Sequence, residues 1–303
     1  MCRNHFHSGA LTCGRVEVYK ERMPLLTVLL YSFLGTFLTF FAGTVTHSMI
    51  KILPPYGYAL RAVVYVCSAY IVVKGLSKSV GLTLADCRIP YPHISVRGIC
   101  SAVLISVLFL GINIWGQPGS WRFHAKTWKE TEEAFFYLIF YTGFCSSIVE
   151  EMVFRGYLVK LSENRWGRRK GMILPGLLFG LVHSFPFGTS YLYGQLFFYL
   201  SISILFTVMT YRSGSIWDSV LVHAFWDIFV VRNIVFSIDH QENTESFFSY
   251  VLTGNVPNPI LELSMTQRYV LYSIAFLVLA GMVQMFFCPR RQKQTEFKSL
   301  GKS

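Results

Sequence analysis

The sequence predicts an all-α, polytopic membrane protein with about eight transmembrane helices. Three observations lead to this fold class. Of the 303 residues, 53% are hydrophobic and only 14% are charged, whereas soluble domains carry about 25% charged residues. The hydrophobic residues gather in stretches of roughly the 20 residues that a helix needs to cross a bilayer. Most lysines and arginines lie between these stretches rather than within them.

The apolar stretches run from residue 25 to residue 288, and we expect them to form one eight-helix membrane domain. The fourth stretch is the longest, and the fifth is short. Thr127, with Glu130 three residues later, matches a capping box and marks the start of the fourth helix. The expected spans lie near residues 25–46, 56–76, 97–115, 132–160, 171–187, 194–211, 215–236 and 268–288.

The basic residues predict the orientation of these helices. If the polar segment 1–24 is cytoplasmic, most lysines and arginines of the connecting segments lie on that same side, as the positive-inside rule requires. An even number of spans then also places the basic tail 289–303 in the cytoplasm. The net charge of +11 fits contact with anionic membrane lipid, and because no nucleic-acid-binding motif accompanies it, we expect no nucleic-acid partner.

Away from the ends of the expected spans, five acidic or histidine residues lie in their interiors. They are Glu150 and Glu151 in the fourth span, His183 in the fifth, and His223 and Asp227 in the seventh. An ionised side chain at the centre of a bilayer costs about 2.5–3.5 kcal/mol on insertion scales, so such residues usually have a function and a partner.

Helical spacing divides the charges of the fourth span into a pair and a remaining carboxylate. Glu151 and Arg155 are four residues apart, the spacing at which opposite charges meet on a helix. Neighbouring residues point about 100° apart, so Glu150 cannot share that face. Glu150 therefore has no local partner, and a carboxylate of this kind is suited to accept a proton as a general base.

Residues on three different spans lie at one expected depth. Counted along each helix at 1.5 Å per residue, Glu150, His183 and His223 lie about 12–18 Å below the cytoplasmic surface. Asp227 follows His223 by four residues and could orient its ring. Phe179 precedes His183 by the same interval, which usually indicates packing alone. The common depth predicts that the three titratable side chains form one site.

Three short motifs give the chain a family resemblance. The segments "EEMVFR" (150–155), "FGLVH" (179–183) and "HAFWD" (223–227) match, in order, the motifs EExxxR, FxxxH and HxxxN/D. In this respect the chain resembles the CPBP family (CAAX prenyl endopeptidase and bacteriocin-processing proteins, also called the Abi family). The resemblance covers about residues 130–235, the expected catalytic core. It implies an eight-helix intramembrane endopeptidase.

The resemblance also implies roles for the motif residues. Glu150 with His183 would activate a water molecule that attacks a peptide carbonyl, and His223 with Asp227 would stabilise the resulting oxyanion. No metal and no other cofactor would be required. The remaining motif residues would support these four: Glu151, Arg155 and Phe179.

The third motif ends in Asp227, where the eukaryotic prenyl-protein branch of the family has Asn. An Asn side chain can donate a hydrogen bond to an oxyanion, whereas an ionised Asp can only accept one. Asp227 is therefore either protonated or acts by orienting His223 so that His223 donates, and we favour the second. Asp at this position is typical of prokaryotic members, so we expect a prokaryotic cell membrane and a substrate that need not be prenylated.

Two alternatives stay open at this stage. The same histidines and carboxylates could bind zinc in a membrane hydrolase, although the HExxH spacing is absent. The chain could also be a non-catalytic membrane protein, such as a bacteriocin-immunity factor, a scaffold or a transporter. We favour an endopeptidase that cleaves a hydrophobic or lipidated peptide or protein within the membrane.

Overall fold

The computed structural model describes most of the predicted membrane domain. The described residues are 23–51, 54–90, 93–184, 192–253 and 263–286. Apart from Met23 and Pro24, the predicted terminal segments 1–24 and 289–303 lie outside these ranges, so the division of the chain into domains stays a prediction.

Each of the eight predicted apolar segments contains a helix. The helices are α1 (Leu25–His47), α2 (Gly57–Ser79), α3 (Val96–Ile114), α4 (Trp128–Phe135), α5 (Ser147–Glu150), α6 (Val159–Gly171), α7 (Ile173–Ser184), α8 (Leu192–Ser213), α9 (Trp217–Trp226) and α10 (Met265–Phe286). A 3₁₀ turn, Ser48–Lys51, follows α1. Segments of π-helix extend the regular helices at Phe136–Ser146, Glu151–Leu158 and Asp227–Val231.

Six helical stretches among the described residues are long and apolar enough to cross a membrane. They correspond to all the predicted spans except the fifth and the seventh. The fifth contains only α7, with 12 residues, and the seventh contains α9, with 10 residues, and a π-helical segment of five. At 1.5 Å per residue both are shorter than the roughly 30 Å hydrocarbon core. The fold is thus a helical, multi-pass membrane protein, whereas eight spans and cytoplasmic termini stay predictions.

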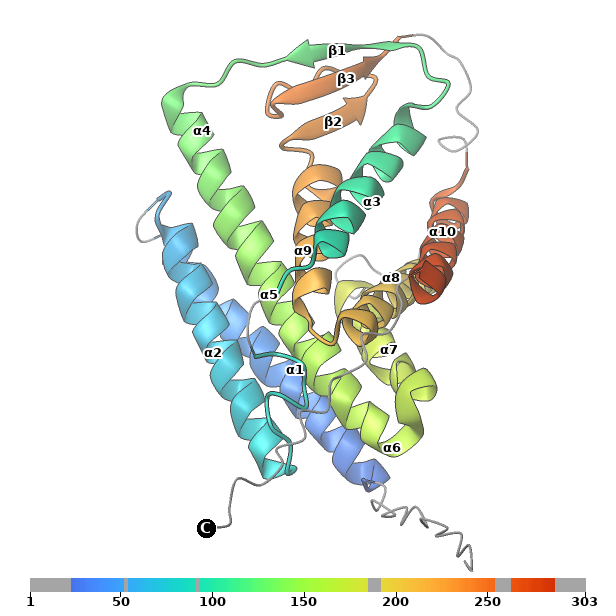
Figure 1. The fold of residues 1–303 in the computed structure, drawn as a ribbon. Coiled ribbons are helices and arrows are strands. Elements are labelled where there is room, and N and C mark those ends of the chain that lie inside the picture. Colours follow the sequence, from blue (N-terminus) through green and yellow to red (C-terminus); the bar gives the residue numbers. More distant parts are fainter. Residues whose placement is uncertain (1–22, 52–53, 91–92, 185–191, 254–262, 287–303) are drawn as a thin grey trace, which may run out of the picture.

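One continuous helical stretch, Trp128–Gly171, runs diagonally through the molecule from α4 through α5 to α6 (Figure 1). Its start is the predicted capping box, since Thr127 Oγ1 accepts from the backbone N–H of Glu130 and the Glu130 side chain accepts in return. Near its end, Gly167 leaves helical geometry at φ 75°, a conformation that favours glycine. The chain turns at this glycine, inside the predicted connection between the fourth and fifth spans.

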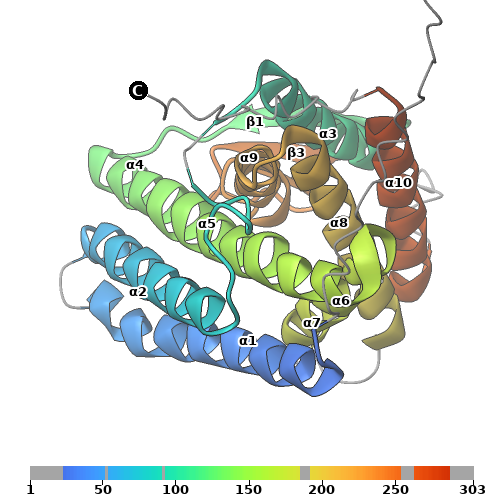
Figure 2. The same cartoon turned by 60° about the horizontal axis from the view of Figure 1, so that its bottom comes forward.

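Burial separates inner helices from outer ones. Within the most apolar part of each helix, 53% of the residues are buried in Trp128–Gly171 and 56% in α8, against 22–28% in α1, α2, α3 and α10. The outer helices carry exposed apolar side chains suited to contact with lipid, such as Phe33, Phe37 and Leu104. Figure 2 shows α9 and α5 inside the bundle, with α1 and α2 side by side on one edge and α10 on another.

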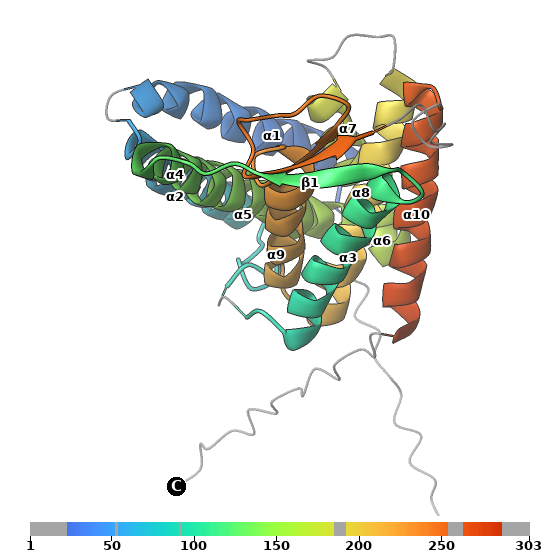
Figure 3. The ribbon, with the colours of Figure 1, turned by 90° about the horizontal axis from the view of Figure 1, so that it is seen from above.

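A three-stranded sheet, which an all-α fold does not include, covers one end of the bundle (Figure 3). Its strands are β1 (Gly119–Phe123), β2 (Phe236–Asp239) and β3 (Phe248–Leu252), in the order β1-β3-β2. β1 pairs antiparallel with β3, and β2 pairs parallel with it. Each strand has only four or five residues, and β1 is distant in sequence from its partner β3, so local patterning gives little signal for the sheet.

Helix α9, which carries His223 and leads into the segment that begins at Asp227, is held against the start of α3. Ser95 caps α3, and its backbone N–H and its hydroxyl each donate to the buried carboxylate of Asp218 at 2.8 Å. Close approach of the two helices depends on Gly98, because a Cβ atom at this position would lie 2.7 Å from Asp218 Cγ. The contact fixes the position of α9, along its axis, relative to α3.

We predict that Gly98→Ala lowers the thermal stability of the purified protein. The added methyl group must push Asp218 away, and overpacking of this kind costs about 1–3 kcal/mol. Gly75→Ala is the matched control, since a Cβ at Gly75 in α2 meets nothing within 4 Å, and alanine is the better helix former by about 1 kcal/mol. Thermal unfolding in detergent measures both variants. Equal loss of stability in the two would contradict the packing argument.

Candidate active site

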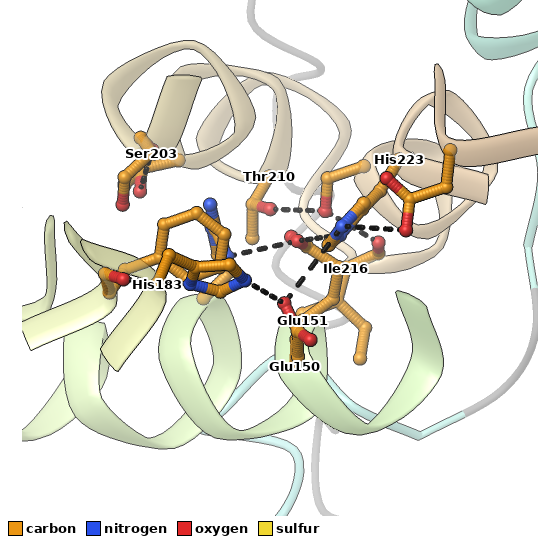
Figure 4. A network of polar contacts seen from close by, with 12 residues as sticks. Glu150, Glu151, His183, Ser203, Thr210, Ile216 and His223 are labelled. Atoms are coloured by element: carbon orange, nitrogen blue, oxygen red, sulfur yellow. Dashed lines mark hydrogen bonds and ion pairs between the residues drawn. The ribbon is translucent and has the colours of Figure 1, made fainter. Parts of the chain in front are cut away.

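Three separate stretches of helix bring the predicted site residues together (Figure 4). Glu150 ends α5, and Glu151 begins the π-helical segment that follows. His183 lies one residue before the end of α7, His223 lies on α9, and Asp227 begins the π-helical segment after α9. Residues 72 positions apart in the sequence, such as Glu151 and His223, are in direct contact.

Glu150 lies between the two histidines. Its Oε2 atom is 3.5 Å from His183 Nε2 and 3.9 Å from His223 Nε2. Asp227 Oδ2 lies 3.8 Å from the same His223 nitrogen. Each of these three contacts is short enough for one bridging water molecule, which meets the geometric requirement for a general base that acts through water.

The other ring nitrogen of each histidine has its own partner. His183 Nδ1 is 2.8 Å from the carbonyl oxygen of Phe179, and His223 Nδ1 is 2.9 Å from Glu151 Oε1. Both partners are acceptors, so each Nδ1 carries a hydrogen and donates it. The Nε2 atom of each ring is thereby directed at Glu150.

The structure corrects the predicted partner of His223. Sequence spacing favours Asp227 as the residue that orients this ring, but Nδ1 donates its hydrogen bond to Glu151. Asp227 instead lies on the Nε2 side, at a distance beyond hydrogen bonding. The helical spacing argument misses this because it compares residues of one helix, whereas the partner lies on another.

Glu151 also forms the predicted ion pair with Arg155. Glu151 Oε1 and an Arg155 terminal nitrogen are 3.0 Å apart, and both side chains are fully buried. The guanidinium group lies 4.1 Å from the ring centroid of Phe179 and 5.1 Å from that of Phe206. Aromatic faces stabilise a cation without neutralising it, so the Glu151 carboxylate is the charge that balances Arg155.

Glu150 has no partner within its own helix, as the spacing predicts, but it is not isolated in the fold. Both Glu150 and Glu151 contact the His223 ring, one at each nitrogen. Side chains that point about 100° apart on one helix can hold a ring of a second helix from two sides. The segment Glu151–Leu158 is π-helical, a rare geometry that occurs often at functional sites.

The phenylalanine of the second motif does more than fill space. The Phe179 ring contacts the His183 ring at a centroid distance of 4.3 Å, and it also contacts the Arg155 guanidinium. Its carbonyl oxygen accepts from the same histidine. Phe179 thus fixes His183 through both its ring and its backbone.

Helix α8 supplies site residues that the sequence does not single out. Tyr199 packs on His183 at a centroid distance of 4.7 Å, and Phe206 packs on His223 at 5.3 Å. Thr210 shares a hydrogen bond of 3.1 Å with Ser219, one turn before His223. Aromatic and small hydroxyl residues are common throughout this apolar helix, so no pattern distinguishes these positions.

The side chains of the site differ in their exposure to solvent. The side chains of His183, Glu150 and Asp227 are 25%, 17% and 13% exposed, whereas Glu151 and Arg155 are sealed. Glu150 lines a cavity of about 440 Å³ between α1, α2 and the fourth helical stretch. A bound molecule can therefore reach Glu150 without contacting the buried ion pair.

Within the described ranges, no three His, Cys, Asp or Glu side chains form a group that could hold a metal ion. A chelation experiment tests the zinc alternative.

The segment that carries these residues is similar to a known protein family. Residues 132–229 match the family model of type II CAAX prenyl endopeptidase Rce1-like proteins. Over this segment the chain is similar to Rce1-like proteins. The matched residues include all three motifs and correspond closely to the predicted core 130–235. No curated protein gives a significant match to the chain.

The match agrees with the predicted CPBP resemblance. Together with the apolar helices, it supports an integral, multi-pass membrane protein of the protease class. An Rce1-like segment indicates CAAX-type intramembrane protease activity at that general level. A prokaryotic source, the reaction mechanism and the substrate stay predictions.

We predict that Arg155→Met strongly destabilises the protein. Loss of the guanidinium leaves the fully buried Glu151 without its charge partner, and breaking a buried ion pair in this way costs about 3–5 kcal/mol. The double variant Glu151→Gln/Arg155→Met removes both charges and should recover part of the loss. Thermal unfolding of the two variants beside the unsubstituted protein measures this. Wild-type stability of Arg155→Met would show that the pair is not essential.

Proposed function

We propose that the protein is an intramembrane endopeptidase in which Glu150 and His183 activate a water molecule that attacks a peptide bond. The observation that carries the proposal is the convergence of two histidine Nε2 atoms on one glutamate oxygen. The Rce1-like match over the same residues supports the reaction class.

The distances around Glu150 favour a water molecule between the side chains. Contacts of 3.5 and 3.9 Å exceed the 2.7–3.2 Å typical of direct hydrogen bonds, and a polar contact of that length commonly holds a bridging water. Because His183 donates from Nδ1, its Nε2 presents a lone pair to Glu150. Two facing acceptors need a donor between them, and a water molecule can donate to both.

A water molecule in this position is set up for attack. As its oxygen bonds to the substrate carbonyl carbon, Glu150 takes a proton from it, and His183 accepts or holds the second hydrogen. The protonated Glu150 then gives the proton to the departing amine nitrogen as the C–N bond breaks. General acid–base assistance of this kind contributes about 10²–10⁴-fold to the rate.

His223 is the candidate donor to the oxyanion. To donate from Nε2 while Nδ1 donates to Glu151, the ring must carry a hydrogen on both nitrogens. Glu151 on one side and Asp227 on the other would balance the positive charge of that form. Asp227 therefore acts through His223 and does not need to be protonated itself.

The substrate fits the setting of the site. Because Glu150, His183 and His223 lie within apolar helices, a peptide that reaches them must leave water, which favours hydrophobic or lipidated segments. Membrane lipid surrounds the domain, and no feature of the described site suits a nucleic acid.

We predict that Glu150→Gln abolishes hydrolysis and leaves the fold intact. The amide keeps the size of the side chain but cannot accept the proton, so we expect a rate loss of at least about 100-fold. Glu133→Gln is the matched control, since Glu133 is exposed on α4 of the same helical stretch. Comparing the membrane peptidomes of cells that carry each variant identifies the substrate and measures the loss.

Two outcomes of this experiment separate the alternatives. If Glu150→Gln retains the wild-type phenotype while present in the membrane, the protein acts as a scaffold, an immunity factor or a transporter. If hydrolysis by the unsubstituted protein is lost on strong chelation and returns with zinc, the same residues act through a metal.

We predict that Asp227→Asn retains hydrolysis within about tenfold of the wild-type kcat/KM. Glu151 still orients His223, and the new amide can donate a hydrogen bond to the oxyanion. The measurement uses a peptide found in the peptidome comparison. A loss of more than 100-fold would show that the negative charge of Asp227 is required.

A further inference from the structure

The cavity beside Glu150 has a second chemical feature at some distance from the catalytic side chains. Its floor is formed by buried residues of α1, α2 and the fourth helical stretch, and its rim by exposed residues of α1. A volume of about 440 Å³ lies within the usual range of ligand pockets. Its lining residues are Phe40, Gly43, Thr44, His47, Arg61, Tyr65, Tyr141, Cys145, Ser146, Glu150 and Arg232.

Arg61 is buried in this cavity without a carboxylate partner. The side chain is 8% exposed, and its guanidinium lies 4.4 Å from the ring centroid of Tyr141 and 5.5 Å from that of Tyr65. One terminal nitrogen donates to the Gly43 carbonyl oxygen over a long 3.4 Å, and the buried Nε has no hydrogen-bond partner. No acidic side chain in the described ranges forms an ion pair with it within 4 Å.

Arg232 brings a second positive charge to the same cavity. It directly follows the π-helical segment that begins at Asp227, and its buried Nε also lacks a hydrogen-bond partner. Across the described part of the chain it forms no ion pair with a carboxylate within 4 Å, Asp227 included. Two guanidinium groups therefore line one cavity, and neither forms an ion pair within 4 Å with a carboxylate of the described residues.

This arrangement is unfavourable without a ligand. A buried charge in a membrane domain normally pairs with an opposite charge, and two like charges on one cavity repel each other. The aromatic rings beside Arg61 are neutral and leave its charge uncompensated. The missing counter-charge is thus expected from a bound molecule.

We propose that Arg61 and Arg232 form a subsite for an anionic oxygen group, a carboxylate or a phosphate. Guanidinium groups bind both through pairs of charge-assisted hydrogen bonds. Glu150 also lines the cavity, and its negative charge repels such a group, which favours contact with the arginines. A substrate is thereby oriented, with its anionic group at the arginines and its scissile bond at Glu150.

The inference deepens the proposed endopeptidase function and depends on it for the identity of the substrate. The anionic group has two possible sources. One is a carboxylate of the substrate peptide, and the other is the phosphate of a membrane lipid that enters from the rim at His47 and Thr44. The chemistry at the arginines is the same in both cases.

Equilibrium binding tests the subsite without requiring catalysis. The probe is a hexapeptide of leucine, valine and phenylalanine with a fluorescent group at its amino end, prepared as the free acid and as the carboxamide. Binding of each form to the full chain in phosphatidylcholine nanodiscs is followed by fluorescence anisotropy. Nanodiscs with added phosphatidic acid provide the lipid arm, in which the lipid competes with the peptide.

The variants are Arg61→Gln, Arg61→Lys and Arg232→Gln, with Arg122→Gln as the matched control. Arg122 is exposed on β1, so its substitution removes the same net charge outside the cavity. We expect the acid to bind the wild type and Arg122→Gln about tenfold more tightly than the amide, the size of one charged hydrogen bond. Arg61→Gln and Arg232→Gln should lose this preference, and Arg61→Lys should keep part of it.

Each outcome decides the proposal. Loss of the acid preference in the two glutamine variants supports a peptide carboxylate. Equal binding of acid and amide, with competition by phosphatidic acid that Arg232→Gln abolishes, supports the subsite with lipid phosphate as its ligand. Equal binding of acid and amide to the wild type, with no competition by phosphatidic acid, overturns the proposal. Because this comparison uses only the wild type, it can be made even if Arg61→Gln fails to fold. Continued hydrolysis by Glu150→Gln would defeat the proposed function but leave the binding result readable.

Discussion

The Glu151 carboxylate is the interaction on which the rest of this site depends. It is fully buried, it pairs with Arg155 on its own helix, and it accepts a hydrogen bond from His223 on α9. A single oxygen atom, Oε1, makes both contacts. Charge balance inside the bundle and the orientation of the His223 ring are therefore one constraint. Any change that moves this carboxylate alters both the stability of the fold and the geometry around Glu150.

That constraint explains the division of labour between two adjacent glutamates. Glu151 is sealed and supports the structure, while Glu150 remains partly exposed and faces the cavity. His183 is fixed from its other side by Phe179, so each histidine has one nitrogen held by the protein and one directed at Glu150. Fixed hydrogen-bond donors and acceptors thus surround a space that a water molecule can fill.

Much of this could be predicted from the sequence, and the failures have physical causes. The eight apolar segments, the capping box at Thr127 and the Glu151–Arg155 pair depend on spacing within one helix, which the sequence displays directly. The convergence of Glu150, His183 and His223 follows from their common depth. The partner of His223, the packing of Phe206 and the three-stranded sheet depend on contacts between distant segments. Short helices such as α7 also cannot be counted as spans from hydropathy alone.

The sheet has a mechanical consequence for the bundle. β1 directly precedes α4, and β2 and β3 follow the helical segment that carries His223 and Asp227. Their pairing therefore ties the outer ends of the stretches that carry Glu150 and His223 together. Relative sliding of these stretches would break backbone hydrogen bonds. The hairpin of α1 and α2 contributes none of the three strands of this sheet. Displacement of that hairpin as a unit would widen the cavity at Arg61 while the distances among Glu150, His183 and His223 stay fixed.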